Sequence, residues 1–321
     1  MASMSIEGRQ MPLAVEPNGS SSVAALLQAV ARARELFSNA LLAHGALLFR
    51  GFDVAGLGDF ARFVSAFSGE DKLFDYAGGA SPRSGLSAAN PGVYSSTEYP
   101  SHVGLSLHNE LSYAGVYPKR LYFFCVTAPE SGGETTIGDS RRILNNLPPA
   151  LVDKFRTRKI RYIRNLHPEK GYGYSWQEAL GTDSRSEAEA CCRRIGADFE
   201  WQPGGMLRMS QVRPATAVHP MTREEVWFNQ ADGFHPTALG AEMYEQMMAL
   251  CGSEERFRLN VSYGDGTHIE LEALHTIRTL LIAETVPHRW RPGDILVIDN
   301  LLAAHGRLPF AGRRKIALAM T

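Results

Sequence analysis

Two short segments that lie far apart in the sequence constrain the fold more than any other feature. The first is His108-Asn109-Glu110, and the second is GDILVIDNLLAAHGR at residues 293–307, which contains His305. Two imidazoles and one carboxylate form the ligand set of a facial non-haem iron site, which leaves adjacent positions on the metal open. If the three side chains share one ion, the long chain between the segments must fold back to where it began.

The spacing inside the first segment suits metal binding from an extended strand. Residues i and i+2 of a strand point to the same side, so His108 and Glu110 can reach one ion while Asn109 faces away. The third ligand must then come from a distant strand. An apolar run at residues 295–298, bounded by turn residues, predicts that strand just before His305.

Each ligand also has a plainer interpretation. A single histidine usually lies at the surface or forms hydrogen bonds in the core, and a His-x-Glu sequence alone is equally unspecific. A zinc hydrolase could use the same ligand types, but its common helical motif His-Glu-x-x-His is absent. We expect the plainer interpretation for the remaining histidines: His44, His102, His167, His219, His235, His268, His275 and His288.

Arg314 strengthens the interpretation of the two segments as one site. It follows His305 by nine residues, at the start of a predicted apolar strand. A planar guanidinium at that position can bind a carboxylate through two hydrogen bonds. The other members of arginine pairs are predicted to lie on solvated faces: Arg141, Arg142, Arg193, Arg194 and Arg313.

With these residues the chain resembles the Fe(II)/2-oxoglutarate-dependent dioxygenases of the taurine dioxygenase superfamily. Within it, the chain is similar to the amino-acid hydroxylases of bacterial natural-product pathways. The resemblance covers most of the chain. It rests on the motifs ALLFRGF (46–52), YSSTEYP (94–100), LHNELSY (107–113), PESGGETTIGDS (129–140) and VWFNQADGFH (226–235).

The resemblance implies a set of roles and cosubstrates. His108, Glu110 and His305 would hold Fe(II), with 2-oxoglutarate and O2 as cosubstrates. Arg314 would bind the distal carboxylate of 2-oxoglutarate, and Thr135 would form a hydrogen bond to that carboxylate. The implied reaction is hydroxylation of an unactivated carbon, with desaturation or cyclisation as less favoured outcomes.

Two positions bear on the substrate. Many relatives have aspartate at the position of Glu110, and Glu110 itself resembles the amino-acid-hydroxylating branch. Halogenating relatives have a small residue there, so the resemblance argues against halogenation. Leu318 stands four residues after Arg314, where the taurine enzyme has a second arginine for the sulfonate. Burial of a sulfonate without a paired cation would be costly. The sequence therefore favours an amino acid, free or tethered to a carrier protein, over a sulfonate.

The substrate pocket is less well defined by the sequence. A Gly/Ser/Pro-rich stretch at residues 78–92 is interpreted as a substrate lid or as a surface connection. Candidate pocket residues, each with core packing or loop hydrogen bonding as the alternative, are Arg83, Tyr99, Phe228, Asn229 and Gln230.

Length and composition favour one dioxygenase domain over residues 1–321 with a large core, since 44% of the residues are hydrophobic. A net charge of −1 gives no electrostatic case for nucleic acid or a membrane surface. We expect a small-molecule substrate, while the oligomeric state stays open. Four cysteines without Cys-x-x-Cys spacing indicate reduced thiols and a cytoplasmic location.

The expected architecture is mainly β with flanking helices, in a double-stranded β-helix of the jelly-roll and cupin type. Residues 1–9 include IEGR, which matches an engineered protease site, and are left out of the fold prediction. Residues 140–200 are predicted to be a helical insertion between barrel strands. Apolar periodicity predicts further helices at 23–42, 57–67, 243–250 and 271–283, and strands at 46–52, 121–126, 134–137, 206–212 and 225–229.

Two other functions are compatible with this architecture. One is a non-catalytic jelly-roll binding protein, against which the intact ligand set and Arg314 argue. The other is a metal hydrolase in which the same three side chains hold zinc and a bound water. An anaerobic iron titration with 2-oxoglutarate separates the three hypotheses, because only the oxygenase should form the metal-to-ligand charge-transfer absorption of the ternary complex.

Overall fold

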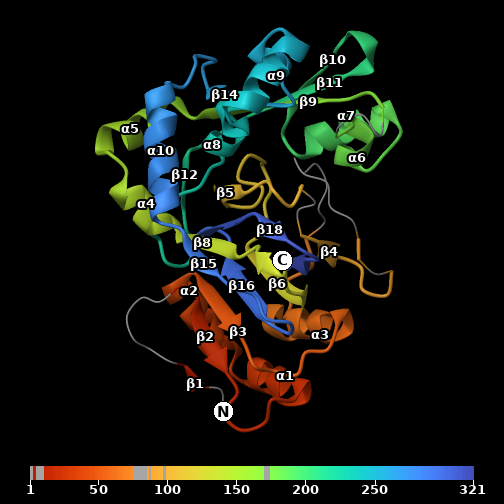
Figure 1. Ribbon diagram of the computed structural model, residues 1–321, viewed down its shortest axis with the longest axis vertical. Helices are drawn as coiled ribbons and strands as arrows, with labels where there is room; N and C mark the ends of the chain where they lie inside the picture. The colour runs from red at the N-terminus through yellow and green to blue at the C-terminus, as the bar shows by residue number, and fades with distance from the viewer. Residues whose placement is uncertain (1–2, 5–10, 75–84, 87, 97–98, 170–173) are drawn as a thin grey trace.

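The computed structural model describes residues 3–4, 11–74, 85–86, 88–96, 99–169 and 174–321. Figure 1 shows N-terminal helices at one end of the long axis, β-sheets in the middle, and a smaller sheet with its own helices at the other end. The metal-ligand segments belong to the middle layer, at β5 and β17.

The larger central sheet has seven strands and is apolar on both faces at its centre. Every residue of β16 is buried, because helices cover one face of the sheet and a second sheet covers the other. The strand order is β1 (Ser3–Met4), β2 (Leu13–Glu16), β3 (Ala46–Phe49), β16 (Ile295–Asp299), β6 (Arg120–Thr127), β19 (Lys315–Met320) and β4 (Tyr94–Ser95). Neighbouring strands are antiparallel apart from β2 and β3, which are parallel.

The second central sheet carries both histidine ligands. Its antiparallel strands lie in the order β15 (Val286–His288), β8 (Thr135–Asp139), β17 (Ala303–Arg307) and β5 (Leu105–His108). An apolar cluster that includes Phe123 of β6, Ile137 of β8 and Leu318 of β19 packs the two sheets together. A short ladder of β7 (Ser131–Gly132) and β18 (Phe310–Ala311) lies beside them. The predicted return of the chain to one site is thus confirmed by the pairing of β5 with β17.

Three N-terminal helices cover the outer face of the larger sheet. They are α1 (Val23–Arg32), α2 (Arg34–His44) and α3 (Leu57–Ser68). The prediction of one helix over residues 23–42 was wrong in one respect: the chain leaves helical geometry at Ala33, which has φ −110° and ψ 28°. The apolar residues at helical spacing are nevertheless buried at Leu26, Val30, Phe37, Leu41, Phe60, Phe63, Val64 and Phe67, whereas Ala33 is only partly buried.

The region predicted as a helical insertion also contains strands. Its helices are α4 (Ser140–Asn146), α5 (Pro149–Arg158), α6 (Trp176–Leu180) and α7 (Arg185–Arg194). A third sheet runs through it, in the order β10 (Asp198–Trp201), β11 (Leu207–Arg213), β9 (Ile160–Leu166) and β14 (Leu259–Tyr263). The prediction from the composition of residues 140–200 therefore missed β9, whose alternating burial depends on partner strands outside that range.

The elements between the third sheet and β15 close one side of the molecule. They are η1 (Pro203–Gly205), β12 (Thr216–Val218), β13 (Glu225–Trp227), α8 (Ala231–Phe234), η2 (Pro236–Leu239), α9 (Ala241–Cys251), η3 (Glu254–Arg256) and α10 (Leu271–Ala283). The helix α10 has the predicted bounds and buries Leu274, Ile277 and Leu281. The helix α9 forms as predicted but has no buried residue, so its apolar side chains do not pack into the core.

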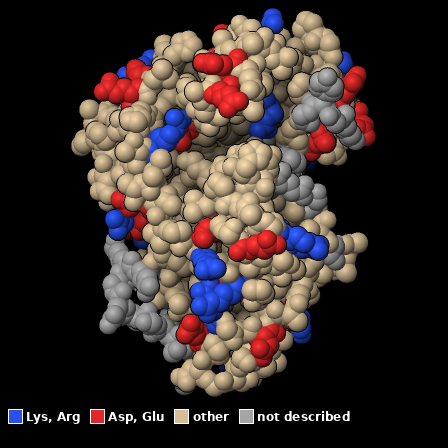
Figure 2. Space-filling model, in the orientation of Figure 1, with Lys and Arg blue, Asp and Glu red and all other residues tan. Residues whose placement is uncertain are grey.

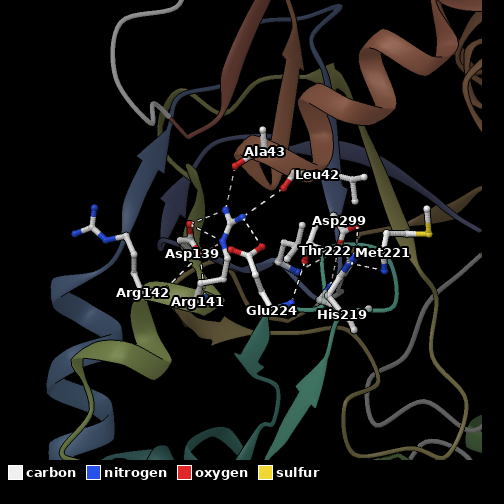
Figure 3. Close-up of polar contacts among 12 residues, drawn as sticks. Leu42, Ala43, Asp139, Arg141, Arg142, His219, Met221, Thr222, Glu224 and Asp299 are labelled. Carbon is white, nitrogen blue, oxygen red and sulfur yellow. Dashed lines mark hydrogen bonds and ion pairs between the residues drawn. The ribbon is translucent and has the colours of Figure 1, made fainter.

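A buried polar network ties α2 to the end of β8 (Figure 3). The Arg141 guanidinium donates two bonds to the Asp139 carboxylate, Nε to Oδ1 at 2.9 Å and Nη2 to Oδ2 at 2.8 Å. It also donates to the carbonyls of Leu42 and Ala43 in the last turn of α2, which have no partner within the helix. The prediction that Arg141 lies on a solvated face was wrong, because its side chain is only 7% exposed.

The surface agrees with the near-neutral net charge. Figure 2 shows lysine and arginine side chains interspersed with aspartate and glutamate on the visible face, without a continuous patch of one sign. In the described part of the chain, none of the helices has the length and apolar character needed to span a membrane.

Candidate metal centre and adjoining cavities

The two histidines lie side by side on neighbouring strands. His108 is the last residue of β5 and His305 is the middle residue of β17, and the two are direct partners in the antiparallel ladder. Their ring centroids are 4.3 Å apart. Because side chains alternate along β17, His305 faces the space between the sheets, where its ring lies 5.3 Å from that of Phe123.

Glu110 joins the histidines from a turn rather than from a strand. The strand β5 ends at His108, and Leu111 has a positive φ of 55°. The expectation of an extended strand through Glu110 was therefore wrong. The outcome that it predicted still holds, since the Glu110 carboxylate lies 3.7 Å from His305 Nε2 and Asn109 faces away. Asn109 instead donates to Ser140 Oγ at 3.1 Å and to the Asn300 carbonyl at 2.8 Å.

Asn300, which sequence reasoning treated only as a strand end, fixes the backbone of Glu110. Its Oδ1 accepts from the Glu110 N–H at 2.7 Å, and its Nδ2 donates to the carbonyls of Glu110 and Pro118. Asp299 beside it caps the turn into β17 through the N–H groups of Leu301 and Leu302. The available signal was a pair of polar residues that directly follows a fully apolar strand.

The donor set fits a divalent first-row metal. One ligand atom from each of His108, Glu110 and His305 lies within 4.8 Å of the other two. Glu110 and His305 are buried, and His108 is partly exposed, so the cluster has one open side. Two neutral imidazoles and one carboxylate suit Fe(II), and a solvent-accessible side leaves room for further ligands.

Arg314 is turned into the protein next to this cluster, as its position in the sequence predicted. Its neighbours Arg313 and Lys315 are exposed. Its Nε donates to the Gly133 carbonyl at 3.0 Å, and its Nη2 lies 3.4 Å from Thr135 Oγ1. Burial lowers the pKa of the Arg314 guanidinium to about 10, so the group still carries its charge at neutral pH.

One cavity joins the metal cluster to Arg314. We refer to it as the cosubstrate cavity, and its lining residues are Ser96, Leu105, His108, Phe123, Thr135, His305, Gly306, Arg307 and Arg314. Sequence reasoning missed Ser96, whose Oγ accepts from Arg314 Nη1 at 3.3 Å. It also missed Trp290, whose indole N–H donates to Thr135 Oγ1 at 3.0 Å and orients that hydroxyl.

A second cavity shares His108 and Leu105 of β5 with the first. We refer to it as the substrate-side cavity. Its lining is mostly apolar, with Trp227, Phe234, Leu259, Ile277 and Leu281 as examples. Three of the predicted substrate residues, Tyr99, Asn229 and Gln230, also line it. Arg83 lies outside the described residues.

The predicted substrate residues differ in what their side chains already bind. Phe228 is not among the residues that line the cavity, and it packs against Tyr117 with ring centroids 4.7 Å apart. Asn229 Nδ2 donates to the Ala215 carbonyl, and Gln230 Nε2 donates to the Asn109 carbonyl. The Tyr99 hydroxyl accepts from Arg258. The amides therefore shape the cavity wall through bonds within the protein.

Asp232, in the quoted motif VWFNQADGFH but not among the predicted residues, supplies a buried carboxylate to the substrate-side cavity. Its Oδ1 pairs with Arg278 at 2.7 Å, and its Oδ2 accepts only from Ser106 Oγ, at 3.3 Å, within the described residues. A carboxylate oxygen can accept more than one hydrogen bond, so Oδ2 retains capacity for a donor.

Comparison with known proteins identifies relatives along nearly the whole chain. A family model described as "Taurine catabolism dioxygenase TauD, TfdA family" matches residues 8–320. The dapdiamide synthesis protein DdaC of Enterobacter agglomerans is 37% identical over 276 residues, which is 86% of this chain and 82% of DdaC. A clavaminate synthase-like protein of Arabidopsis thaliana is 28% identical over 98% of this chain and 94% of its own length.

A solved structure shows the same fold at low sequence identity. PvcB of Pseudomonas aeruginosa aligns with a TM-score of 0.57 and 17% identity, over 99% of this chain and 90% of PvcB. A second structure of PvcB describes it as an Fe, alpha-ketoglutarate dependent oxygenase from an isonitrile synthetic pathway. At this identity the likeness supports the arrangement of sheets and helices and leaves the substrate undetermined.

Proposed function

Because the chain belongs to the TauD/TfdA family of Fe(II)/2-oxoglutarate-dependent dioxygenases, we propose that it hydroxylates an amino-acid-type substrate at an iron held by His108, Glu110 and His305. Arg314 and Thr135 bind the distal carboxylate of 2-oxoglutarate. The two central sheets form a double-stranded β-helix, and residues 1–321 act as one dioxygenase domain in which part of 140–200 is an insertion.

The observation that carries this proposal is the shared cavity between the metal cluster and Arg314. A dianion of the length of 2-oxoglutarate has one carboxylate for each end of such a cavity. Arg314 is partly buried and has no ion pair to any described carboxylate, and an anionic ligand would supply that missing charge. A zinc hydrolase or a non-catalytic binding protein would have no need for this arrangement.

When bound, the iron supplies the activation of O2 that allows an unactivated carbon to be oxidised. The chain supplies position and protection. Thr135 is oriented by Trp290 and orients the cosubstrate carboxylate, while Phe123 and Leu105 keep water from the space between the sheets. Asn300 holds the turn that carries Glu110, so that the carboxylate stays aimed at the histidines.

An amino group on the substrate is favoured by the substrate-side cavity. Asp232 is the one carboxylate in the described lining, and no lysine or arginine lines that cavity. Leu318 is completely buried in the apolar cluster between the sheets, so no cation stands there for a sulfonate. The relative DdaC takes part in dapdiamide synthesis, which supports a natural-product role and an amino-acid-derived substrate, free or carrier-tethered.

An anaerobic titration tests the cosubstrate assignment. Addition of 2-oxoglutarate to the Fe(II) protein should give the metal-to-ligand charge-transfer absorption of the ternary complex. The Arg314→Gln variant should need a higher 2-oxoglutarate concentration for the same absorption, whereas Arg313→Gln should behave as wild type. Hydrolysis supported by zinc alone, without this absorption in the wild-type protein, would favour the hydrolase.

A substrate screen tests the second part of the proposal. Free amino acids, their carrier-tethered forms and taurine are compared by succinate release and by product mass. We expect turnover of an amino-acid form, and a much higher KM in Asp232→Asn with little change in the charge-transfer absorption. Efficient sulfite release from taurine, with no amino-acid form accepted, would refute the substrate class without affecting the iron assignment.

The four free cysteines support the cytoplasmic location.

A further inference from the structure

Arg307 is a buried cation to which the proposed reaction assigns no role. It lies on β17 two residues after His305, so both side chains face the same side of the sheet. Its partner in the ladder with β8 is Thr135, and its side chain lines the cosubstrate cavity. Arg307 is 5% exposed, which is unusual for an arginine without a paired acid among the residues that the structure describes.

The charge of Arg307 has no counter-ion in the part of the chain that the structure describes. No ion pair there joins Arg307 or Arg314 to a carboxylate, so the two guanidiniums place two positive charges around one cavity. Burial of an uncompensated cation is unfavourable by several kcal/mol in proteins. An anionic ligand in the cavity would offset part of this positive charge, because the distal carboxylate of 2-oxoglutarate supplies a negative charge that the metal end does not take up.

The same guanidinium holds the segment that leads into β5. Its Nη1 donates to the Tyr99 carbonyl at 3.3 Å, and its Nη2 donates to the carbonyls of Pro100 and Val103 at 2.8 and 2.7 Å. Its Nε–H is buried and has no acceptor among the described residues. Tyr99 lines the substrate-side cavity, so Arg307 is in contact with the walls of both cavities.

We propose that Arg307 is a positioning residue that couples the two cavities. The anionic cosubstrate stabilises the guanidinium in its buried position, and the guanidinium in turn holds residues 99–103 against the substrate-side cavity. This inference rests on the proposed cosubstrate cavity. Its consequence is that the substrate-side wall becomes ordered when the cosubstrate binds, before any substrate arrives.

The test uses the full chain with Mn(II) and N-oxalylglycine, an unreactive stand-in for 2-oxoglutarate. Calorimetry gives the dissociation constant, and hydrogen exchange at saturating ligand follows the backbone amides of Tyr99 and residues 101–104, since Pro100 has no N–H. In the wild type, N-oxalylglycine should slow exchange in this segment about tenfold or more. Arg307→Gln should bind the ligand about tenfold more weakly, and at saturation the segment should gain no protection.

The variant Arg307→Lys separates charge from geometry and provides a second route if Arg307→Gln does not fold. An ammonium keeps the charge but lacks the planar fork that reaches three carbonyls. Its affinity for N-oxalylglycine should stay within about threefold of wild type, whereas the ligand-induced protection should be lost. Exposed Arg313→Gln is the matched control and should match the wild type in both measurements.

Arg314→Gln distinguishes failure of the coupling from failure of the cavity assignment. It should weaken N-oxalylglycine binding and leave the exchange of the ligand-free segment unchanged. Wild-type affinity in Arg314→Gln would mean that the cavity is wrongly assigned. Ligand-induced protection that persists in both Arg307 variants would overturn the coupling, even if their ligand-free exchange were faster.

Discussion

Arg141 and Arg314 lie at opposite ends of β8, beside Asp139 and Thr135, and the surroundings of the two guanidiniums differ. The Arg141 guanidinium has acceptors within the protein, since it donates to Asp139, Glu224 and two helix carbonyls. Burial alone would lower the pKa of Arg141, but the combined attraction of Asp139 and Glu224 outweighs it and the pKa is raised. In the cosubstrate cavity, burial lowers the pKa of Arg314, and none of the described carboxylates is in contact with it. A cation that is paired with a carboxylate inside the protein indicates a structural role, and one without such a partner indicates a site for an anionic ligand.

The largest expected effect comes from removal of a metal ligand. Each of His108→Ala, Glu110→Ala and His305→Ala should abolish stable Fe(II) binding and coupled succinate formation, because three ligands are the minimum that fixes a facial site. Metal content and product yield measure this. The Arg141 region should be unaffected, so the unfolding transition of the metal-free protein should stay close to wild type. Wild-type product formation by all three variants would end the iron assignment.

Removal of Arg141, which has a carboxylate partner, should lower the stability of the fold and leave ligand binding unchanged. Arg141→Ala leaves Asp139 buried without its partner, so we expect the free energy of unfolding to fall by about 3–5 kcal/mol. Denaturant unfolding measures the loss. N-oxalylglycine should bind the folded variant as it binds wild type. Arg142→Ala is the control, since that side chain is 62% exposed and its ion pair with Glu284 should contribute at most about 1 kcal/mol.

Removal of Arg314, which has no carboxylate partner among the described residues, should give the reverse pattern: weaker cosubstrate binding without a loss of stability. Arg314→Ala should raise the 2-oxoglutarate requirement roughly tenfold or more, which corresponds to about 1.5–3 kcal/mol for a charge-assisted pair. Iron affinity should change little. The ligand-free protein should be no less stable than wild type, because an uncompensated cation has been removed. If Arg313→Ala or Lys315→Ala raised the requirement instead, the orientation assigned to Arg314 would be incorrect.

A smaller effect is expected when Asn300, which holds the turn that carries Glu110, is replaced. Asn300→Ser removes the hydrogen bonds that hold the Glu110 backbone and should weaken Fe(II) binding about tenfold, as is usual for groups that orient a ligand. The N-oxalylglycine affinity of the metal-loaded variant should remain close to wild type. Exposed Asn146→Ala provides a control of similar size. Unchanged metal affinity in Asn300→Ser would show that the turn holds Glu110 without this side chain.

The residues that sequence reasoning located well are those set by a local period. Helical spacing correctly predicted most of the buried residues of α1, α2 and α3, and Arg313 is exposed as predicted. The errors fall where tertiary contacts override the local pattern. Arg141 was predicted to be solvated because it is a charged residue. It is buried because its partners come from α2 and from Glu224, which no local pattern reveals.

The sequence by itself determined the ligand types, their spacing and the need for a distant chain return, because these depend on side-chain chemistry and on the period of a strand. Only the tertiary structure decided that Glu110 reaches the histidines from a turn held by Asn300, that Phe228 packs away from the substrate-side cavity, and that Asp232 lines it. These outcomes depend on contacts between segments far apart in the chain, whose geometry is fixed by packing and hydrogen bonding of the whole fold.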